Sequence, residues 1–334
     1  MRNFIKKHKK LDYLQKTFRR RKNAEFVADV LEMDKNPSYV KICNEQKADG
    51  RILYVTETMG CDGFFAELRF VLHEVYFATK YGFTPIVTMS ERSSYKEDKP
   101  ILGTDNPFEY YFKQLVDIDY KSARENYAYV RHNWVQRKQI EVDTGMVENN
   151  YKITDEYMST MANIVKNHLV YNDTTKMYLD EATKPMLGRT LLGVHVRGAD
   201  FKRGYQNHPF MVTVDEYLEN VKKIYGEGNF DGIFLATDDL EAIEKFTNEF
   251  KENLFYFKDV IRTDGDETVM KSVSDRENHH YKLGLEVIRD MHALSLCEGL
   301  IAGMSNVSIF ARILKQSRSE KYSLLYIIDK GIKK

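Results

Sequence analysis

Residues 191–200 have the sequence LLGVHVRGAD, an apolar run that ends in a polar segment containing a glycine. The run Leu191–Val196 has the composition of a strand buried in a parallel sheet. Ligands of an open parallel sheet bind beyond the carboxyl ends of its strands. The residues that follow Val196 therefore mark a candidate binding site, with Arg197 as its principal side chain.

Strands and helices alternate downstream of this segment. The expected elements are strands at 232–237, 254–257 and 299–302 and helices at 214–225, 240–250, 280–297 and 307–315. This succession predicts a Rossmann-type layer of parallel strands covered by helices. Residues 322–328 are apolar enough to be buried, as either a late strand or a helix.

A second alternation of strands and helices precedes this Rossmann-type layer in the sequence. A strand at 51–56, a turn at 60–63, a helix ending near Lys80 and a strand at 84–89 predict another sheet, followed by a helix at 154–168. Residues 116–150 give mixed signals, and 172–188 are expected to be a connection. The predicted fold class is therefore α/β with two Rossmann-like domains.

A chain of 334 residues exceeds the usual size of a single hydrophobic core, so two domains are expected. The predicted division is a basic N-terminal arm at 1–22, a first domain at 23–185, a second domain at 186–316 and a C-terminal tail at 317–334. No apolar run is long enough to span a bilayer. Three widely spaced cysteines and the absence of a secretory signal favour a cytoplasmic protein.

The basic arm carries ten lysines and arginines against one acid, although the whole chain has 50 basic and 50 acidic residues. A solvated, disordered extension is the favoured interpretation. Peripheral contact with anionic lipid at the inner face of the membrane comes second, because apolar residues interleave with the charges at roughly helical spacing. Nucleic-acid binding comes last and is not expected, since no recognition motif follows.

The first strand end offers several candidate ligand contacts. The Arg197 guanidinium can hold a phosphate through two hydrogen bonds, and Gly198 lets a ligand approach the backbone. The alternative for Arg197 is a structural ion pair with Asp200 or Asp239. Asp200 could orient Arg197 or cap a turn, and the cap is favoured. His195 is either a ligand contact or a buried histidine bonded to a backbone carbonyl.

Two further strand ends are polar. Ser305 and Asn306 begin a helix, where an anion is favoured and where either residue could instead serve only as a cap. Asp238 and Asp239 also precede a helix and are weaker candidates for ligand contacts, because an aspartate at a helix N-terminus is ordinarily a cap. Neither a dinucleotide-binding GxGxxG nor a P-loop follows any strand, and no cluster with metal-ligand spacing is present, so no metal is expected.

Three blocks resemble the GDP-fucosyltransferase superfamily. They are HVRGAD at 195–200, FLATDD at 234–239 and VIRDMHALSLCEGLIAGMSNVSIFAR at 287–312. The pattern is most similar to the α-1,6-fucosyltransferase group, which contains bacterial nodulation-factor and eukaryotic core fucosyltransferases. The blocks lie within roughly residues 190–315, in the order of that group.

The resemblance implies a GT-B architecture, GDP-fucose as donor, inversion at the anomeric carbon and no need for a metal or other cofactor. If the roles of the family's residues are carried over to the matching positions, Arg197 would bind the β-phosphate. His195 and Asp200 would shape that site. Asp290 would accept hydrogen bonds from the guanine edge, and Ser305 and Asn306 would meet phosphate. Without the resemblance, Asp290 would be taken as an exposed helical charge.

The chain departs from the family in two places. The family has two successive arginines in its first block, whereas Gly198 takes the second place here, which weakens the identification of the donor. The acidic residue expected soon after the block is also absent. A general base must remove a proton from the acceptor hydroxyl. We expect it in the first domain, with Asp62 and Glu67 as candidates; their alternatives are a turn aspartate and a surface glutamate.

The leading hypothesis is an inverting, metal-independent fucosyltransferase that uses GDP-fucose and a glycan acceptor, in polysaccharide biosynthesis. A second hypothesis keeps the fold and changes the nucleotide-sugar donor. A third is a non-catalytic module that binds glycan or nucleotide.

Overall fold

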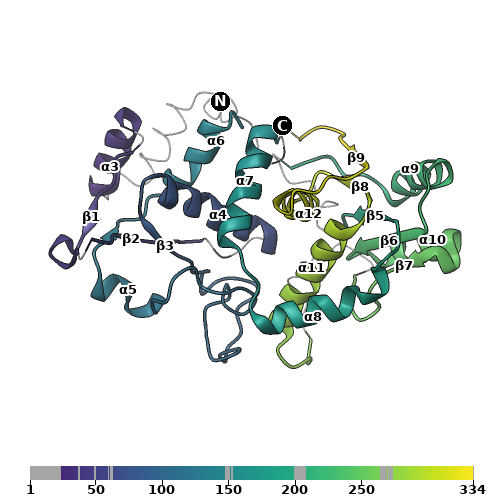
Figure 1. Cartoon of the computed structure of the whole chain (residues 1–334), viewed down its shortest axis with the longest axis horizontal. Coiled ribbons are helices and arrows are strands. Elements are labelled where there is room, and N and C mark those ends of the chain that lie inside the picture. The colour runs from purple at the N-terminus through teal and green to yellow at the C-terminus, as the bar shows by residue number, and fades with distance from the viewer. Residues whose placement is uncertain are drawn as a thin grey trace.

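The computed structural model describes residues 24–333, except for 37, 49, 59, 61–62, 147–150, 152, 199–207, 264–268 and 270–273. These residues form two separate β-sheets accompanied by helices (Figure 1). The predicted α/β class with two mainly parallel sheets is confirmed. The basic arm at 1–22 lies outside the described residues, as do Asp62 and Asp200.

The second sheet is fully parallel and has the strand order β7-β6-β5-β8-β9. Its strands are β5 (Leu191–Val196), β6 (Gly232–Thr237), β7 (Leu254–Phe255), β8 (Gly299–Gly303) and β9 (Leu324–Ile328). The helices between them are α9 (Val214–Glu227), α10 (Leu240–Phe250), α11 (His279–Leu296) and α12 (Asn306–Ser317). The chain adds β6 and β7 on one side of β5, then returns to add β8 and β9 on the other. The topological switch point therefore lies between β5 and β8.

Strand β9 corrects the predicted domain boundary. The tail predicted at 317–334 contains this strand, which pairs with β8 from Gly299–Leu324 to Gly303–Ile328. It is therefore part of the second sheet. The run LLYII was ambiguous in sequence because uninterrupted apolar residues show neither the alternation of a half-buried strand nor a helical period.

The first sheet is smaller, with the order β1-β4-β2-β3. Its strands are β1 (Ile42–Cys43), β2 (Leu53–Val55), β3 (Thr84–Ile86) and β4 (Tyr129–Val130), and only β1 is antiparallel to its neighbour. Strands β2 and β3 are shorter than predicted, and side-chain hydrogen bonds between Thr56 and Thr88 continue the contact beyond them. Each threonine hydroxyl donates to the carbonyl of the other, over 3.0 and 2.8 Å.

The helices of the first half are α3 (Ala24–Lys35), α4 (Phe64–Lys80), α5 (Tyr120–Asn126), α6 (Gln139–Asp143), α7 (Asp155–His168) and α8 (Asp173–Thr183). Short 3-10 helices lie at Glu45–Lys47, Gln136–Lys138, Lys184–Met186 and Lys251–Asn253. The connection predicted at 172–188 contains helix α8, which Asn172 caps by accepting from the Thr175 N–H over 2.8 Å.

Helices α4, α7 and α12 pack against one another between the two sheets (Figure 1). The rings of Phe65 in α4 and Phe310 in α12 lie 4.8 Å apart and belong to one continuous hydrophobic core. The two halves of the chain are thus joined by buried apolar surface as well as by sequence.

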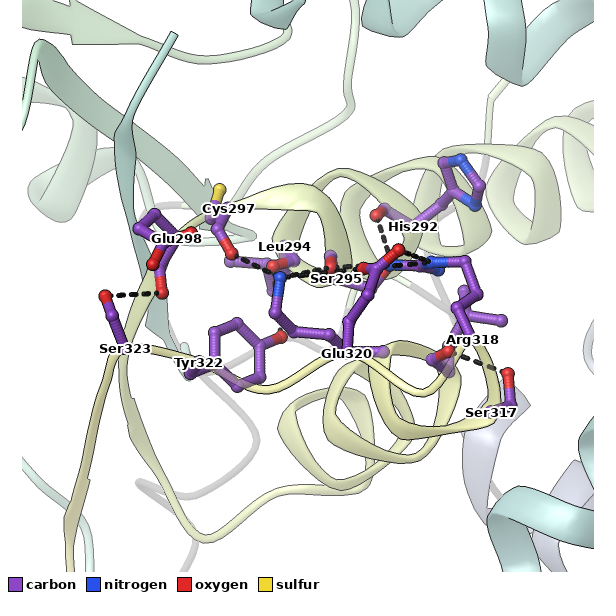
Figure 2. A network of polar contacts seen from close by, with 12 residues as sticks. His292, Leu294, Ser295, Cys297, Glu298, Ser317, Arg318, Glu320, Tyr322 and Ser323 are labelled. Atoms are coloured by element: carbon purple, nitrogen blue, oxygen red, sulfur yellow. Dashed lines mark hydrogen bonds and ion pairs between the residues drawn. The ribbon is translucent and has the colours of Figure 1, made fainter. Parts of the chain in front are cut away.

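A network of cations fixes the carboxyl end of α11 before β8 begins (Figure 2). Lys315 Nζ donates to the Cys297 carbonyl over 2.9 Å, and Arg318 Nη2 donates to the Ser295 carbonyl over 2.7 Å. Carbonyl groups at a helix end lack intrahelical partners and attract positive charge. This network anchors the amino end of β8, opposite to the end that carries Ser305.

None of the helices in the described ranges combines the length and the apolar character that crossing a membrane requires.

Candidate functional site

A hydrogen bond joins the ends of β5 and β8 at the topological switch point. His195 Nδ1 lies 3.2 Å from Oγ of Ser305, which follows β8 and caps α12. Residues 110 positions apart in sequence are therefore brought together where open α/β sheets bind ligands. The structure confirms that the polar ends of these two strands meet.

His195 is buried, with 6% of its surface exposed. Burial lowers the pKa of His195 to about 3, and the positive charge of Arg197 acts in the same direction. The imidazole is therefore neutral at physiological pH. His195 is thus buried, as one alternative expected, but its partner is the Ser305 hydroxyl and not a backbone carbonyl.

Arg197 directly follows β5 and is half-buried. The strand end that carries it is held by Tyr217 of α9, whose hydroxyl is hydrogen-bonded to the backbone at Arg197 and at Gly303. A Cβ atom on Gly303 would lie 2.4 Å from the Tyr217 hydroxyl, so this contact requires glycine. Sequence reasoning missed Tyr217, because its helical spacing resembles that of any core aromatic residue.

Gly198 lies against the first residue after β6. A Cβ atom on Gly198 would lie 2.2 Å from Asp238 Oδ1 and 3.2 Å from Asp239 Cβ. The second arginine of the family pattern therefore has no room here unless Asp238 moves. Glycine in place of the second arginine therefore agrees with the structure, because Asp238 occupies the space beside position 198.

Asp239 is the N-cap residue of α10, as predicted. Its side chain accepts from the Glu241 N–H over 2.9 Å, and its own N–H donates to Thr237 Oγ1 over 3.1 Å. These bonds occupy Asp239 in holding the start of α10. Asp238 is the more exposed of the pair and faces Gly198.

Ser305 and Asn306 are engaged in holding α12. Ser305 accepts from the Ser308 N–H over 3.1 Å and forms a reciprocal capping box with it. Asn306 Oδ1 accepts from Arg69 Nη1 over 2.6 Å. The capping alternative is therefore what the structure shows for Ser305. The backbone N–H groups of the first turn of α12 provide the attraction for an anion.

Arg69, which sequence reasoning did not single out, reaches this helix start from α4. It is 2% exposed, and its Nε donates to the Tyr157 hydroxyl of α7 over 3.1 Å. His73 Nε2 lies 2.7 Å from the same hydroxyl. This buried polar network links α4, α7 and α12. The only sequence signal for it is a charged residue on a helix whose other residues are mostly apolar.

Glu67, a predicted general base, is buried next to this network and is 1% exposed. The alternative of a surface glutamate was wrong, because the start of α4 packs against α12 instead of facing solvent. In this conformation its carboxylate does not line an open surface.

Asp290 of α11 is half-buried near the end of β6. Burial raises the pKa of Asp290 to about 7, against the opposing effect of Arg289 and Arg262, while Glu286 and Asp238 raise it further. The alternative of an exposed helical charge was wrong. The carboxylate is poised to gain from a ligand that donates hydrogen bonds to it.

Two arginines border Asp290. Arg262 Nε donates to the Thr237 carbonyl at the end of β6 over 3.2 Å. Arg289 binds Asp259 through two bonds of 3.0 and 2.7 Å and lies 4.0 Å above the Phe257 ring. These contacts hold both cations beside Asp290.

The arrangement suits a ligand with an anionic centre. Arg197 and the first turn of α12 flank the switch point with positive charge and N–H dipoles. Asp238 and Asp290, at the end of β6, offer carboxylates to donor groups farther along the same ligand. Among the described residues no group of three or more His, Cys, Asp or Glu is arranged to hold a metal ion.

Comparisons with family models and with curated protein sequences find no match. The chain is similar to solved structures of fucosyltransferases. Fucosyltransferase NodZ from Bradyrhizobium is 14% identical, with a TM-score of 0.49 over 79% of this chain and 91% of that chain. NodZ α-1,6-fucosyltransferase co-crystallised with GDP is 14% identical, with a TM-score of 0.49 over 79% and 92%. POFUT1 in complex with GDP is 10% identical, with a TM-score of 0.46 over 84% and 98%.

Proposed function

We propose that this chain is a glycosyltransferase that moves fucose from GDP-fucose to a hydroxyl group of a glycan acceptor, with inversion at the anomeric carbon and without a metal. The observation that carries the proposal is the position of Arg197. It lies at the switch point of a Rossmann-type sheet, beside the start of α12, with the strand ends held together by His195 and Ser305.

Such a site can stabilise a departing nucleoside diphosphate. As the glycosidic bond breaks, negative charge builds up on the diphosphate oxygens while the fucosyl group becomes cation-like. Fixed positive charge from Arg197 and the N–H groups of α12 lowers the energy of that charge separation. His195 is neutral and buried, so it positions Ser305 and does not add charge.

Inversion requires a base on the acceptor side that removes the hydroxyl proton as the new bond forms. Of the two predicted candidates, Glu67 is buried and could reach an acceptor only if α4 or the elements packed on it moved. The proposal therefore favours Asp62, in the segment before α4. We expect Asp62→Asn to abolish transfer while leaving GDP affinity intact.

The choice of GDP rests on Asp290. A guanine base presents two adjacent donors, N1–H and the 2-amino group, and a carboxylate can accept from both. Neither uracil nor adenine offers this pair of donors. Asp290 and Asp238 lie on the β6 side of Arg197, where a base would follow its diphosphate.

Thermal unfolding with GDP, UDP and ADP tests the donor class. A nucleotide present at 100 times its dissociation constant adds about 2.7 kcal/mol to the free energy of unfolding. We expect this stabilisation for GDP alone. Stabilisation by UDP or ADP in place of GDP would favour the alternative of another nucleotide-sugar donor.

Arg197→Met is expected to weaken GDP binding by at least an order of magnitude, because it removes a charged hydrogen-bond donor. Arg189→Met is the matched control. Arg189 precedes β5 and donates to the Asp231 carbonyl over 3.3 Å, at the opposite end of the sheet. Equal GDP affinities in the two variants would contradict the proposed site.

Transfer itself is tested by incubating the chain with GDP-fucose, a mixed glycan array and EDTA. Product of inverted configuration at the anomeric carbon, seen by NMR, is the expected result. GDP binding without transfer or donor hydrolysis would favour the alternative of a non-catalytic binding module.

A further inference from the structure

A cavity of about 500 Å³ lies beside the start of α12, at the carboxyl ends of β8 and β9. Met304, directly after β8, and Asp329, directly after β9, line it, together with Thr154 at the start of α7. Its size is within the range of small-ligand sites, and its place in the sheet is one where ligands bind.

Two of its polar side chains are already satisfied. Thr154 Oγ1 donates to the Thr144 carbonyl over 2.8 Å and accepts from the Tyr157 N–H over 3.1 Å. Ser308 Oγ donates within the α12 cap, at 2.9 Å from the Gly303 carbonyl. Recognition of a ligand therefore falls to the remaining polar residues of the wall.

Arg312 is one of the polar residues of the cavity wall that remain for ligand recognition. It lies one turn after Ser308 on the same face of α12, and burial lowers its pKa. Within the described ranges, no carboxylate approaches its guanidinium to ion-pair distance, and Asp155 acts on it only through longer-range attraction. A partly buried guanidinium with five donors and no bound acceptor favours a ligand that supplies oxygen atoms.

Asp329 is another polar residue of the cavity wall that remains for ligand recognition. Its Oδ1 accepts from the Gly331 N–H over 2.7 Å, which fixes the carboxylate at the rim. Asp329 and Arg312 line the same cavity, yet they form no ion pair in the described structure. The space between them suits a group that both donates to a carboxylate and accepts from a guanidinium. Sugar hydroxyls do both, and Tyr151 adds an aromatic wall for the apolar face of a sugar ring.

The cavity shares a wall with the proposed donor site. Ser308 lines it and is bonded to Ser305, which in turn bonds His195 at the switch point. A sugar held here would lie next to the diphosphate end of a donor.

We propose that this cavity binds an uncharged hexose unit of the acceptor glycan, with Arg312 and Asp329 hydrogen-bonding its hydroxyls. The statement that this hexose belongs to the acceptor rests on the proposed function. The statement that the cavity binds a hexose does not.

The test measures binding of methyl hexosides (glucoside, galactoside, mannoside) and of a methyl hexuronide to the full chain by saturation-transfer NMR, with and without GDP. We expect at least one hexoside to bind. Arg312→Met and Asp329→Asn should each weaken it by about tenfold or more, as for loss of a hydrogen bond to a charged group. GDP affinity should stay unchanged in both variants. Arg92→Met and Asp98→Asn, at exposed positions, are the matched controls.

The proposal is overturned if no hexoside binds, if only the hexuronide binds, or if the two variants bind hexoside as the controls do. It is also overturned if Arg312→Met weakens GDP binding, because the cavity would then belong to the donor. If hexosides bind as expected but GDP does not bind at all, the result contradicts GDP-fucose as the donor and supports the sugar site.

Discussion

Arg69 of α4 donates from Nη1 to Oδ1 of Asn306, the first residue of α12, over 2.6 Å. This bond connects α4, the helix that follows β2 in the first sheet, to α12, the helix that starts at the switch point of the second sheet. The same guanidinium is bonded to Tyr157 of α7 and lies 5.5 Å from the centre of its ring. The start of α12 is therefore positioned by both halves of the molecule.

Replacing Arg69 should destabilise the fold. Arg69→Met leaves the Asn306 and Tyr157 oxygens without their buried donor, and we expect a loss of about 2–4 kcal/mol in the free energy of unfolding. Urea unfolding followed by circular dichroism measures this loss. Arg92→Met, at an exposed position, is the control and should change stability by less than about 0.5 kcal/mol. A loss in Arg69→Met no larger than that of the control would show that the bond contributes nothing.

Replacing Gly198 with alanine should destabilise the fold. Because its Cβ would lie 2.2 Å from Asp238 Oδ1, Gly198→Ala forces that carboxylate to move, and we expect a destabilisation of about 1–3 kcal/mol. Asp238→Ala should relieve most of this effect, so the double variant is more stable than the sum of the single changes predicts.

The control for Gly198 is Gly226 in α9, where a Cβ would meet nothing within 4 Å. Gly226→Ala should be neutral or stabilising by up to about 1 kcal/mol, because alanine favours the helix. Additive effects of Gly198→Ala and Asp238→Ala would refute the close contact.

The free energy of unfolding should decrease as the pH is lowered, and His195 should account for part of this decrease. Its pKa is about 3 in the folded chain, whereas an exposed histidine has a pKa near 6.5. Below pH 6.5 the unfolded chain binds a proton that the folded chain does not, so folding becomes less favourable as the pH decreases toward 3. One such proton corresponds to a slope of about 1.4 kcal/mol per pH unit.

His195→Asn keeps a polar group near Ser305 and removes this titration. Urea midpoints measured across the acidic range should depend less steeply on pH in the variant than in the wild type. Parallel pH profiles would mean that His195 is protonated in the folded chain. His292, whose pKa burial lowers to about 4, contributes in the same direction and is present in both proteins.

GDP affinity should depend on the ionisation of Asp290. Only the carboxylate can accept from both guanine donors, and its pKa near 7 means that it gains a proton as the pH falls below neutrality. We expect the dissociation constant for GDP to rise between pH 8 and pH 6 in the wild type. In Asp290→Asn, binding should be weaker and should depend less on pH over this range, with the remaining dependence due to the terminal phosphate of GDP, whose second pKa is about 6.

Inosine diphosphate lacks the 2-amino group and supplies the matched ligand. It should bind more weakly than GDP to the wild type and lose less on Asp290→Asn. A GDP affinity that is unchanged by Asp290→Asn would remove this residue from the nucleotide site.

The second sheet could be predicted from the sequence because its signals are local. Strands β5 and β6 are mainly apolar runs of six residues, each followed by polar residues, and the structure has them with the predicted bounds. The caps of α9 and α12 are likewise local, since each depends on residues three positions apart. The position of Arg197 at a strand end followed from that pattern alone.

Contacts between distant segments were decided only by the tertiary structure. No local period relates Arg69 to Asn306, 237 positions away, or Arg312 to Asp329 across a cavity. The burial of Glu67 and Asp290 likewise depends on which helices pack over them. The sequence determined where each strand ends and which polar residues follow it. Packing of α4 and α7 on α12 decided which of those residues are covered, because solvent exposure and the pKa of a side chain are set by its neighbours in space.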